Sequence, residues 1–180
     1  MLTIVVLGDE FFDNDTNEFM TVGDVVLELE HSLVSLSKWE SIYEKPFLGK
    51  EKKSPEEIIG YIKAMILTPG IGPDVLNRLS ADNLKAINDY IESKNSATTF
   101  GMMPEQSGRG ETITSELIYY WMVAFTIPFE CENWHLNRLF SLIRICNIKN
   151  GKPKKMGRHE LASRNRMLNE QRRAQLSSSG

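Results

Sequence analysis

One stretch near the end of the chain constrains the fold most, because it predicts a helix that is apolar around most of its circumference. It runs from about Phe129 to Lys149 and is closed by Asn150-Gly151. Its apolar residues are Cys131, Trp134, Leu136, Leu139, Phe140, Leu142, Ile143, Ile145, Cys146 and Ile148. Its polar stripe is narrow and consists of Asn133, Asn137, Ser141 and Arg144. An apolar arc of this width is typical of a helix in the middle of a bundle, so we expect a helical bundle centred on residues 129–149.

Capping residues predict the other helices of this bundle. The clearest start is Ser54-Pro55-Glu56-Glu57, where Ser54 caps, Pro55 occupies the first helical position and Glu57 completes a capping box. Further helices are predicted after Ser32, from about Pro73 to Leu79, after Ser80 and after Thr114. Pro128 ends the last of these. The segment 94–111 lies between them and is predicted as a long loop.

The first 31 residues predict a β-hairpin or a small antiparallel sheet of two to three strands. Leu2 to Leu7 is a nearly continuous apolar run, and Asp24 to Glu30 alternates apolar and polar residues with a period of two. Between them, residues 13–17 have the composition of a turn. The expected fold class is therefore α+β and predominantly helical: one domain over residues 1–150, with the hairpin in 1–31 and the helical bundle in 32–150.

A basic C-terminal tail follows this domain. Residues 151–180 contain eight Lys and Arg against two Glu, a net charge of +6, and subtracting this from the total of −3 leaves −9 for residues 1–150. Residues 158–176 predict a helix with only a thin apolar stripe. A charge run is often just a solvated face, but this tail also fits an acidic partner. Its candidate partner-binding residues are Lys154, Lys155, Arg158, Arg164, Arg166, Arg172 and Arg173.

A cluster of aromatic residues forms the second candidate partner-binding element. Tyr119, Tyr120, Trp121 and Met122 are consecutive, so one face of a helix cannot hold all four. Core packing is the simpler interpretation, and a partner surface is the alternative, because aromatic residues are the usual anchors of interfaces.

No residue pattern in the chain predicts a catalytic, metal or cofactor site. Cys131 and His135 have the spacing of half a zinc site, but the sequence offers few further ligands, so ordinary packing is the better interpretation. Glu28, Glu30 and His31 could form an acid/base cluster at a strand end, but solvent-facing acids on a half-buried strand are the simpler interpretation. Cys131 and Cys146 would lie roughly 22 Å apart on one helix, which is too far for a disulfide. We therefore expect a protein that binds rather than an enzyme, without a cofactor.

The sequence also favours an intracellular, soluble protein. The apolar stretch from Leu117 to Phe129 is shorter than the roughly 20 residues that span a bilayer. Met1 to Val6 lacks the basic region of a secretory signal. No membrane partner is expected, and the acidity of residues 1–150 argues against a general nucleic-acid binder.

A resemblance to a known family is carried by strings spread over nearly the whole chain. They are Leu29-Glu-His-Ser-Leu33, Ser37-Lys-Trp-Glu-Ser41, Lys45-Pro-Phe47, Ile113-Thr-Ser-Glu-Leu-Ile-Tyr-Tyr-Trp-Met122, Ile127-Pro-Phe-Glu-Cys131, Trp134-His-Leu-Asn-Arg-Leu139 and Asn169-Glu-Gln-Arg-Arg-Ala174. In these strings the chain resembles small tail-module proteins of long-tailed (siphovirus-type) bacteriophages, and among them it is most similar to tail assembly chaperones.

The resemblance implies a non-enzymatic protein that binds the tape-measure protein during tail assembly, in the cytoplasm of the infected bacterium. Tail-tube subunits would then displace it. Self-association, with the tail of one copy on the acidic body of the next, is a further expectation. The alternatives are a structural protein of the virion, such as a minor tail protein or a head–tail connector component, and a nucleic-acid-binding protein that uses residues 152–173.

Overall fold

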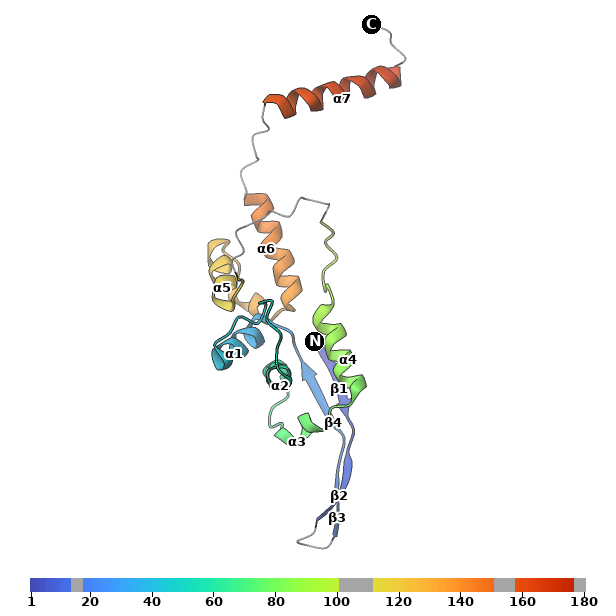
Figure 1. Ribbon diagram of the computed structural model, residues 1–180, viewed down its shortest axis with the longest axis vertical. Coiled ribbons are helices and arrows are strands. Elements are labelled where there is room, and N and C mark those ends of the chain that lie inside the picture. Colours follow the sequence, from blue (N-terminus) through green and yellow to red (C-terminus); the bar gives the residue numbers. More distant parts are fainter. Residues whose placement is uncertain (14–17, 101–111, 151–157, 177–180) are drawn as a thin grey trace. The chain divides into compact units, whose positions relative to one another are not determined.

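The computed structural model describes residues 1–13, 18–100, 112–150 and 158–176 (Figure 1). The chain divides into two compact units, Met1–Asn147 and Ile148–Gly180. The first contains four strands and most of the helices, and the second contains the helix α7, Arg158–Leu176. This confirms the predicted class, α+β and predominantly helical. The candidate residues Lys154 and Lys155, and the centre of the predicted turn, lie outside the described residues.

The strands form two successive antiparallel pairs with one common register. Strands β1 (Leu2–Val6) and β4 (Val25–Leu29) pair from Leu2 opposite Leu29 to Val6 opposite Val25. Strands β2 (Asp9–Asp13) and β3 (Glu18–Val22) pair from Asp9 opposite Val22 to Asp13 opposite Glu18. The predicted antiparallel arrangement of residues 1–31 is therefore confirmed.

Gly8 lies where one pair of strands passes into the other, opposite Gly23. The Gly8 amide donates a hydrogen bond to Asp24 Oδ1 at 2.7 Å, which holds the chain close to the opposite strand. A Cβ atom on Gly8 would collide with the carbonyl oxygen of Val22, whereas a Cβ on Gly23 would meet open space. The junction therefore needs glycine on one strand only.

The β1–β4 pair is buried on one face, as the alternation in β4 predicts. Leu27 and Leu29 are buried while Val26 and Glu28 are exposed, and in β1 Ile4 and Val6 are buried while Val5 is exposed. The buried face packs on the helices that follow, since two strands alone bury too little apolar surface to be stable.

The helices of the first unit begin where their capping residues predict. Ser32, Ser54 and Ser80 each form a reciprocal capping box with the third helical residue, and Thr114 accepts a hydrogen bond from the amide of Leu117. The helices are α1 (Leu33–Tyr43), α2 (Pro55–Met65), α3 (Pro73–Asn77), α4 (Ala81–Glu92), α5 (Ser115–Ala124), the 3-10 helix η1 (Phe129–Asn133) and α6 (Leu136–Asn150).

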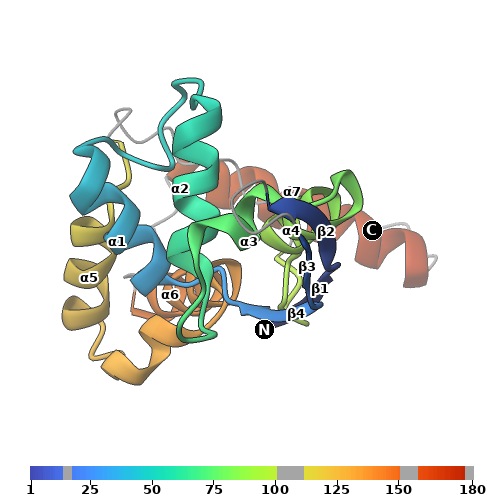
Figure 2. The same ribbon diagram turned by 90° about the horizontal axis from the view of Figure 1, so that it is seen from below.

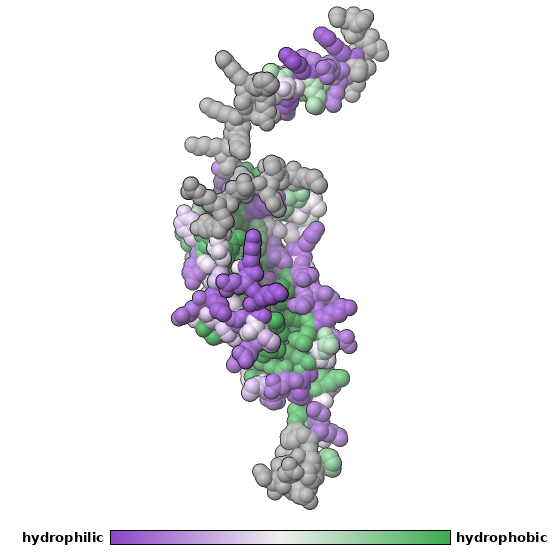
Figure 3. Space-filling model, viewed as in Figure 1, coloured by the Kyte–Doolittle hydropathy of each residue, from purple (hydrophilic) through white to green (hydrophobic). Residues whose placement is uncertain are grey.

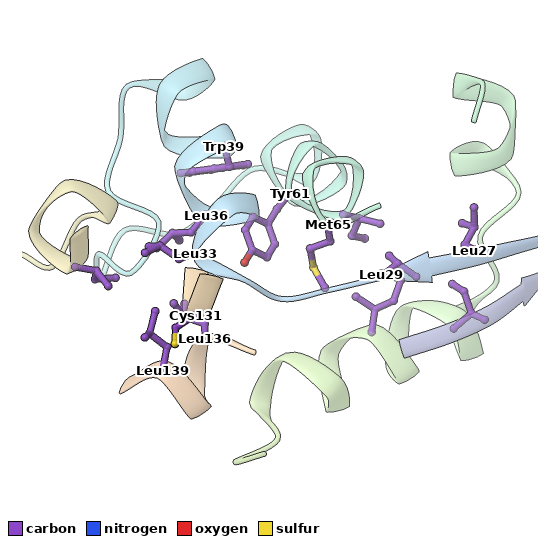
Figure 4. Packing of buried hydrophobic residues seen from close by; sticks show 14 of the residues in the cluster. Leu27, Leu29, Leu33, Leu36, Trp39, Tyr61, Met65, Cys131, Leu136 and Leu139 are labelled. Carbon is purple, nitrogen blue, oxygen red and sulfur yellow. The ribbon is translucent and has the colours of Figure 1, made fainter. Parts of the chain in front are cut away.

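A single apolar cluster joins strands and helices (Figure 4). It takes Leu27 and Leu29 from β4, Leu33, Leu36 and Trp39 from α1, Tyr61 and Met65 from α2, and Leu136 and Leu139 from α6. Trp39, the largest of them, donates from Nε1 to the carbonyl of Glu57 at 2.7 Å. Its polar atom is therefore satisfied inside the core, as a buried indole requires.

The predicted central helix over residues 129–149 is wrong in two respects. Residues 129–133 form the 3-10 helix η1, and α6 begins only at Leu136. The interruption has a long-range cause. His135 forms an isolated β-bridge with Ser32, and the amide of Leu136 donates a hydrogen bond to the carbonyl of His31 at 2.7 Å. Furthermore, α6 buries only Leu136, Leu139 and Ile143.

The centre of the core lies on α1 instead. Leu33, Leu36 and Trp39 are almost completely buried there, and α1 contacts α2, α5 and η1. Figure 2 shows α1 beside α5. The wide apolar arc on α6 therefore does not mark the middle of a bundle: its second half ends in the exposed Ile148.

Replacing Gly8 by Ala is expected to destabilise the first unit, whereas replacing Gly23 by Ala is expected to have little effect. The added methyl on residue 8 must push the Val22 carbonyl aside, at a cost of about 1–3 kcal/mol, as for other overpacked sites. Urea unfolding of both variants and the wild type measures this. Equal free energies of unfolding for the two variants would contradict the close approach at Gly8.

Candidate functional site

The outer side of α5 presents apolar side chains to solvent. Tyr120 is 65% exposed and Val123 is 63% exposed, and Phe129 of η1 is 55% exposed. The opposite side of α5 is buried through Ile118 and Met122. Large apolar side chains that gather in one place on a surface mark interaction sites more often than scattered ones do.

Contacts of Tyr119 join α5 to η1 in one continuous surface. Its hydroxyl donates to Glu132 Oε2 at 2.8 Å, and its ring centroid lies 6.4 Å from that of Phe129. Burial and the neighbouring Glu132 carboxylate raise the pKa of Tyr119 to about 12, so the hydroxyl keeps its proton and the hydrogen bond. We call Glu116, Tyr120, Val123, Phe129, Glu130 and Glu132 the α5–η1 surface.

Carboxylates lie beside the apolar side chains of this surface. Glu116 and Tyr120 are four residues apart on α5 and therefore share a face, while Glu130 and Glu132 lie on η1. The pKa of Glu116 is lowered, chiefly by a hydrogen bond from its own backbone amide and also by Thr114. The surface therefore combines an apolar centre with negative charge, which favours a ligand that is apolar and cationic.

A buried carboxylate of α1 fixes the position of α5. Glu40 Oε2 accepts from the amide of Ser115 at 2.7 Å, and Glu40 Oε1 accepts from the amide of Phe47 at 2.8 Å. Ser115 is the first residue of α5, so this carboxylate satisfies an amide that the helix itself leaves without a partner. It also lies at the positive end of the helix dipole. The α5–η1 surface is thus presented by a helix that is held at its N-terminus.

The structure separates the members of the predicted aromatic cluster. Tyr120 is exposed, Tyr119 and Trp121 are half-buried against the core, and Met122 is completely buried. Core packing therefore accounts for three of the four, and the partner-surface alternative applies to Tyr120. The sequence did not predict the other members of the surface as partner-binding residues, namely Val123, Phe129 and the three carboxylates. Nothing in their local sequence shows which side of α5 faces solvent.

The predicted basic residues lie on α7 as far as they are described. Arg164, Arg166, Arg172 and Arg173 are exposed, while the side chain of Arg158 lies outside the described part. The face of α7 that Figure 3 shows contains several strongly hydrophilic residues. Met167, at 64% exposed, and Leu168, at 39%, are its apolar side chains in the described range. These residues belong to the second compact unit.

A polar cluster lies buried where β4 passes into α1, and the sequence interpretation of it was partly wrong. Glu28 is exposed as expected, but Glu30 is only partly exposed and His31 is 3% exposed. His31 Nδ1 is hydrogen-bonded to the Tyr61 hydroxyl at 2.5 Å, and its ring lies edge-on to that of His135, with centroids 5.1 Å apart. Glu30 accepts from the Tyr90 hydroxyl at 2.6 Å.

The hydrogen bonds of His135 determine its protonation state. Nε2 lies 2.9 Å from the Tyr90 carbonyl, which can only accept, and Nδ1 accepts from the amide of Asn137 at 3.3 Å. The ring is therefore neutral, with its proton on Nε2. Burial also lowers the pKa of His135. Cys131, four residues before His135, is buried in the core and is a free thiol.

Among the described residues, no group of three or more His, Cys, Asp or Glu side chains is arranged to hold a metal ion. No helix within the described ranges is long and apolar enough to cross a membrane.

In comparison with known proteins, no family model, no curated protein and no solved structure matches the chain.

The stability of the first unit is expected to fall as the pH drops from 6.5 towards 4. Burial, reinforced by the nearby His135, lowers the pKa of His31 to about 4, although Glu30 acts in the opposite direction. In that window the unfolded chain binds a proton at residue 31 and the folded chain does not. The free energy of unfolding should therefore decrease by about 1.4 kcal/mol per pH unit from this residue alone. Urea unfolding between pH 7.5 and 4.5 measures the slope.

A His31→Gln variant provides the control. It should be less stable than the wild type at pH 7.5 but should show a shallower dependence on pH. The same slope in both proteins would show that His31 does not titrate in this way.

Proposed function

We propose that this protein is a non-enzymatic tail assembly chaperone of a long-tailed bacteriophage. It binds helical segments of the tape-measure protein in the cytoplasm of the infected bacterium and leaves when tail-tube subunits assemble. The observation that carries the proposal is the α5–η1 surface, with Tyr120 and Val123 more than 60% exposed on a helix that is held at its N-terminus.

The shape and chemistry of this surface suit an amphipathic helix as its ligand. An exposed helix with an apolar stripe can pack lengthwise against the apolar stripe of another helix. Tyr120 and Val123 are three residues apart and lie along one side of α5. Binding would remove these side chains and Phe129 from water. This would stabilise the complex by about 25 cal/mol for each Å² of apolar surface covered.

Two of the strings that resemble phage tail proteins overlap part of this surface. Ile113–Met122 contains Tyr120, and Ile127–Cys131 contains Phe129 and Glu130. Two other strings, Leu29–Leu33 and Trp134–Leu139, contain the backbone pairing of His31 with Leu136. The resemblance therefore includes part of the proposed binding surface, though not Val123 or Glu132, and part of the framework that supports it.

The carboxylates of the surface specify the partner further. Glu116, Glu130 and Glu132 favour a helix whose apolar stripe is flanked by Lys or Arg. Such charges mainly steer the encounter and select the orientation, while the apolar contacts supply most of the affinity. Binding should therefore weaken moderately, and not disappear, as the salt concentration rises.

Replacing Tyr120 and Val123 together by Ser is expected to weaken binding of the tape-measure protein by roughly tenfold or more, because both apolar anchors are lost. The two residues are exposed, so the free energy of unfolding should change little. The measurement is the dissociation constant of the purified full chain for helical fragments of the tape-measure protein from the same phage.

The matched control replaces Ile58 and Leu67 by Ser. These residues are 46% and 54% exposed and belong to α2 and the segment after it, so binding should not change. Equal losses in both double variants, or no binding by the wild type, would overturn the proposal. Quantitative mass spectrometry separates a chaperone, which is abundant in infected-cell lysate and absent from virions, from a structural subunit with a fixed number of copies in virions.

A further inference from the structure

Helix α7 is exposed over its whole described length. Each residue from Ala162 to Arg173 is exposed to solvent, including Met167 and Leu168. Most of the stability of a helix in a protein comes from packing of its apolar face rather than from intrinsic propensity. A partner that covers Met167 and Leu168 would therefore stabilise α7.

The charge and side chains of α7 define what such a partner must offer. Leu168 and Arg172 are four residues apart and share one face, while Arg166 and Arg173 are seven apart and share another. An apolar side chain thus lies beside a guanidinium group, with further positive charge around the helix. The complementary surface has exposed apolar side chains with carboxylates next to them.

The α5–η1 surface has this composition. Tyr120, Val123 and Phe129 supply apolar contact, and Glu116 and Glu130 are exposed carboxylates. Residues 1–150 carry a net charge of −9 and residues 151–180 a net charge of +6, so association of a tail with a body neutralises charge on both. A basic amphipathic helix is also the ligand that we assigned to this surface.

We propose that α7 of one copy docks on the α5–η1 surface of a second copy and occupies it until a tape-measure helix replaces it. This proposal rests on the proposed function, because the two ligands share one surface. Since α7 belongs to a compact unit of its own rather than to the core of the first unit, it can serve as a ligand for another molecule.

This arrangement has consequences for assembly. The donor element and the acceptor surface are different, so the contact is heterologous and each copy can both give and receive a helix. Repeated contacts produce chains or closed rings of copies. Docking keeps the apolar side chains of the α5–η1 surface away from water before a partner is present, and it makes self-association and binding of the tape-measure helix mutually exclusive.

Mixing two complementary variants of the full chain tests the proposal. In the donor variant, Arg172→Glu/Arg173→Glu, the donor helix α7 is changed and the α5–η1 surface stays intact. In the acceptor variant, Tyr120→Ser/Val123→Ser, the α5–η1 surface is changed and α7 stays intact. Sedimentation velocity at low salt should show concentration-dependent association of the wild type, with each variant alone associating roughly tenfold more weakly. An equimolar mixture should form a dimer of twice the monomer mass, since one tail meets one intact surface.

Two outcomes would overturn the proposal: a wild type that remains monomeric, or a mixture that associates no more than its separate components. The first includes the case in which α7 binds the surface of its own molecule. The control Lys63→Glu/Lys85→Glu makes the same change in net charge at exposed residues of α2 and α4, and it should associate like the wild type.

A binding measurement with the donor variant separates this proposal from the proposed function. The donor variant should bind tape-measure fragments at least as tightly as the wild type does, because the competing helix is disabled. Binding of the fragments without self-association would contradict the docking of α7 on a second copy and would leave the proposed function intact. Self-association through these residues without fragment binding would remove the proposed function instead.

Discussion

The fold depends on the backbone of residues 28–32, where β4 passes into α1. The carbonyl of Glu28 accepts from Leu67 at 2.8 Å, the amide of Glu30 donates to the carbonyl of Met65 at 2.9 Å, and the carbonyl of His31 accepts from Leu136 at 2.7 Å. The same stretch ends the pairing with β1 and begins α1 through the cap at Ser32. Five residues therefore connect the sheet, α1, the end of α2 and the start of α6. Burial of Met65, His31 and Leu136 makes two of these hydrogen bonds costly to lose.

The proposed binding surface lies beside this framework. Helix α1 continues from the junction, buries Trp39 in the core and uses the Glu40 carboxylate to hold the first residue of α5. Ile118 and Met122 then fix which side of α5 is buried, and this leaves Tyr120 and Val123 on the other side. Packing of the opposite side of α5 thus leaves Tyr120 and Val123 exposed to solvent. Because this surface is held rigidly, it loses little conformational entropy when a partner binds.

Features that depend on neighbouring residues were predictable from the sequence, and features that depend on distant residues were not. The caps at Ser32, Ser54, Ser80 and Thr114 are local, and all of them are found. The helix predicted over 129–149 is divided because Ser32 bridges His135, about a hundred residues away in the chain. His31 is buried through contacts with Tyr61 and His135, which are also distant in the chain. For the binding site, the tyrosine cluster indicated α5, but only packing against α1 shows that Tyr120, Val123 and Phe129 remain exposed together.

The central claim is that the α5–η1 surface receives a basic amphipathic helix. Hydrogen–deuterium exchange of the donor variant Arg172→Glu/Arg173→Glu, with and without a synthetic peptide of residues 158–176, tests it most directly, because the intact surface is then free to receive the added helix. The account predicts slower exchange in Ser115–Asn133 on addition of the peptide, with α2 and α4 unchanged. Unchanged exchange in that segment, or protection only elsewhere in the described part of the first unit, would contradict the claim.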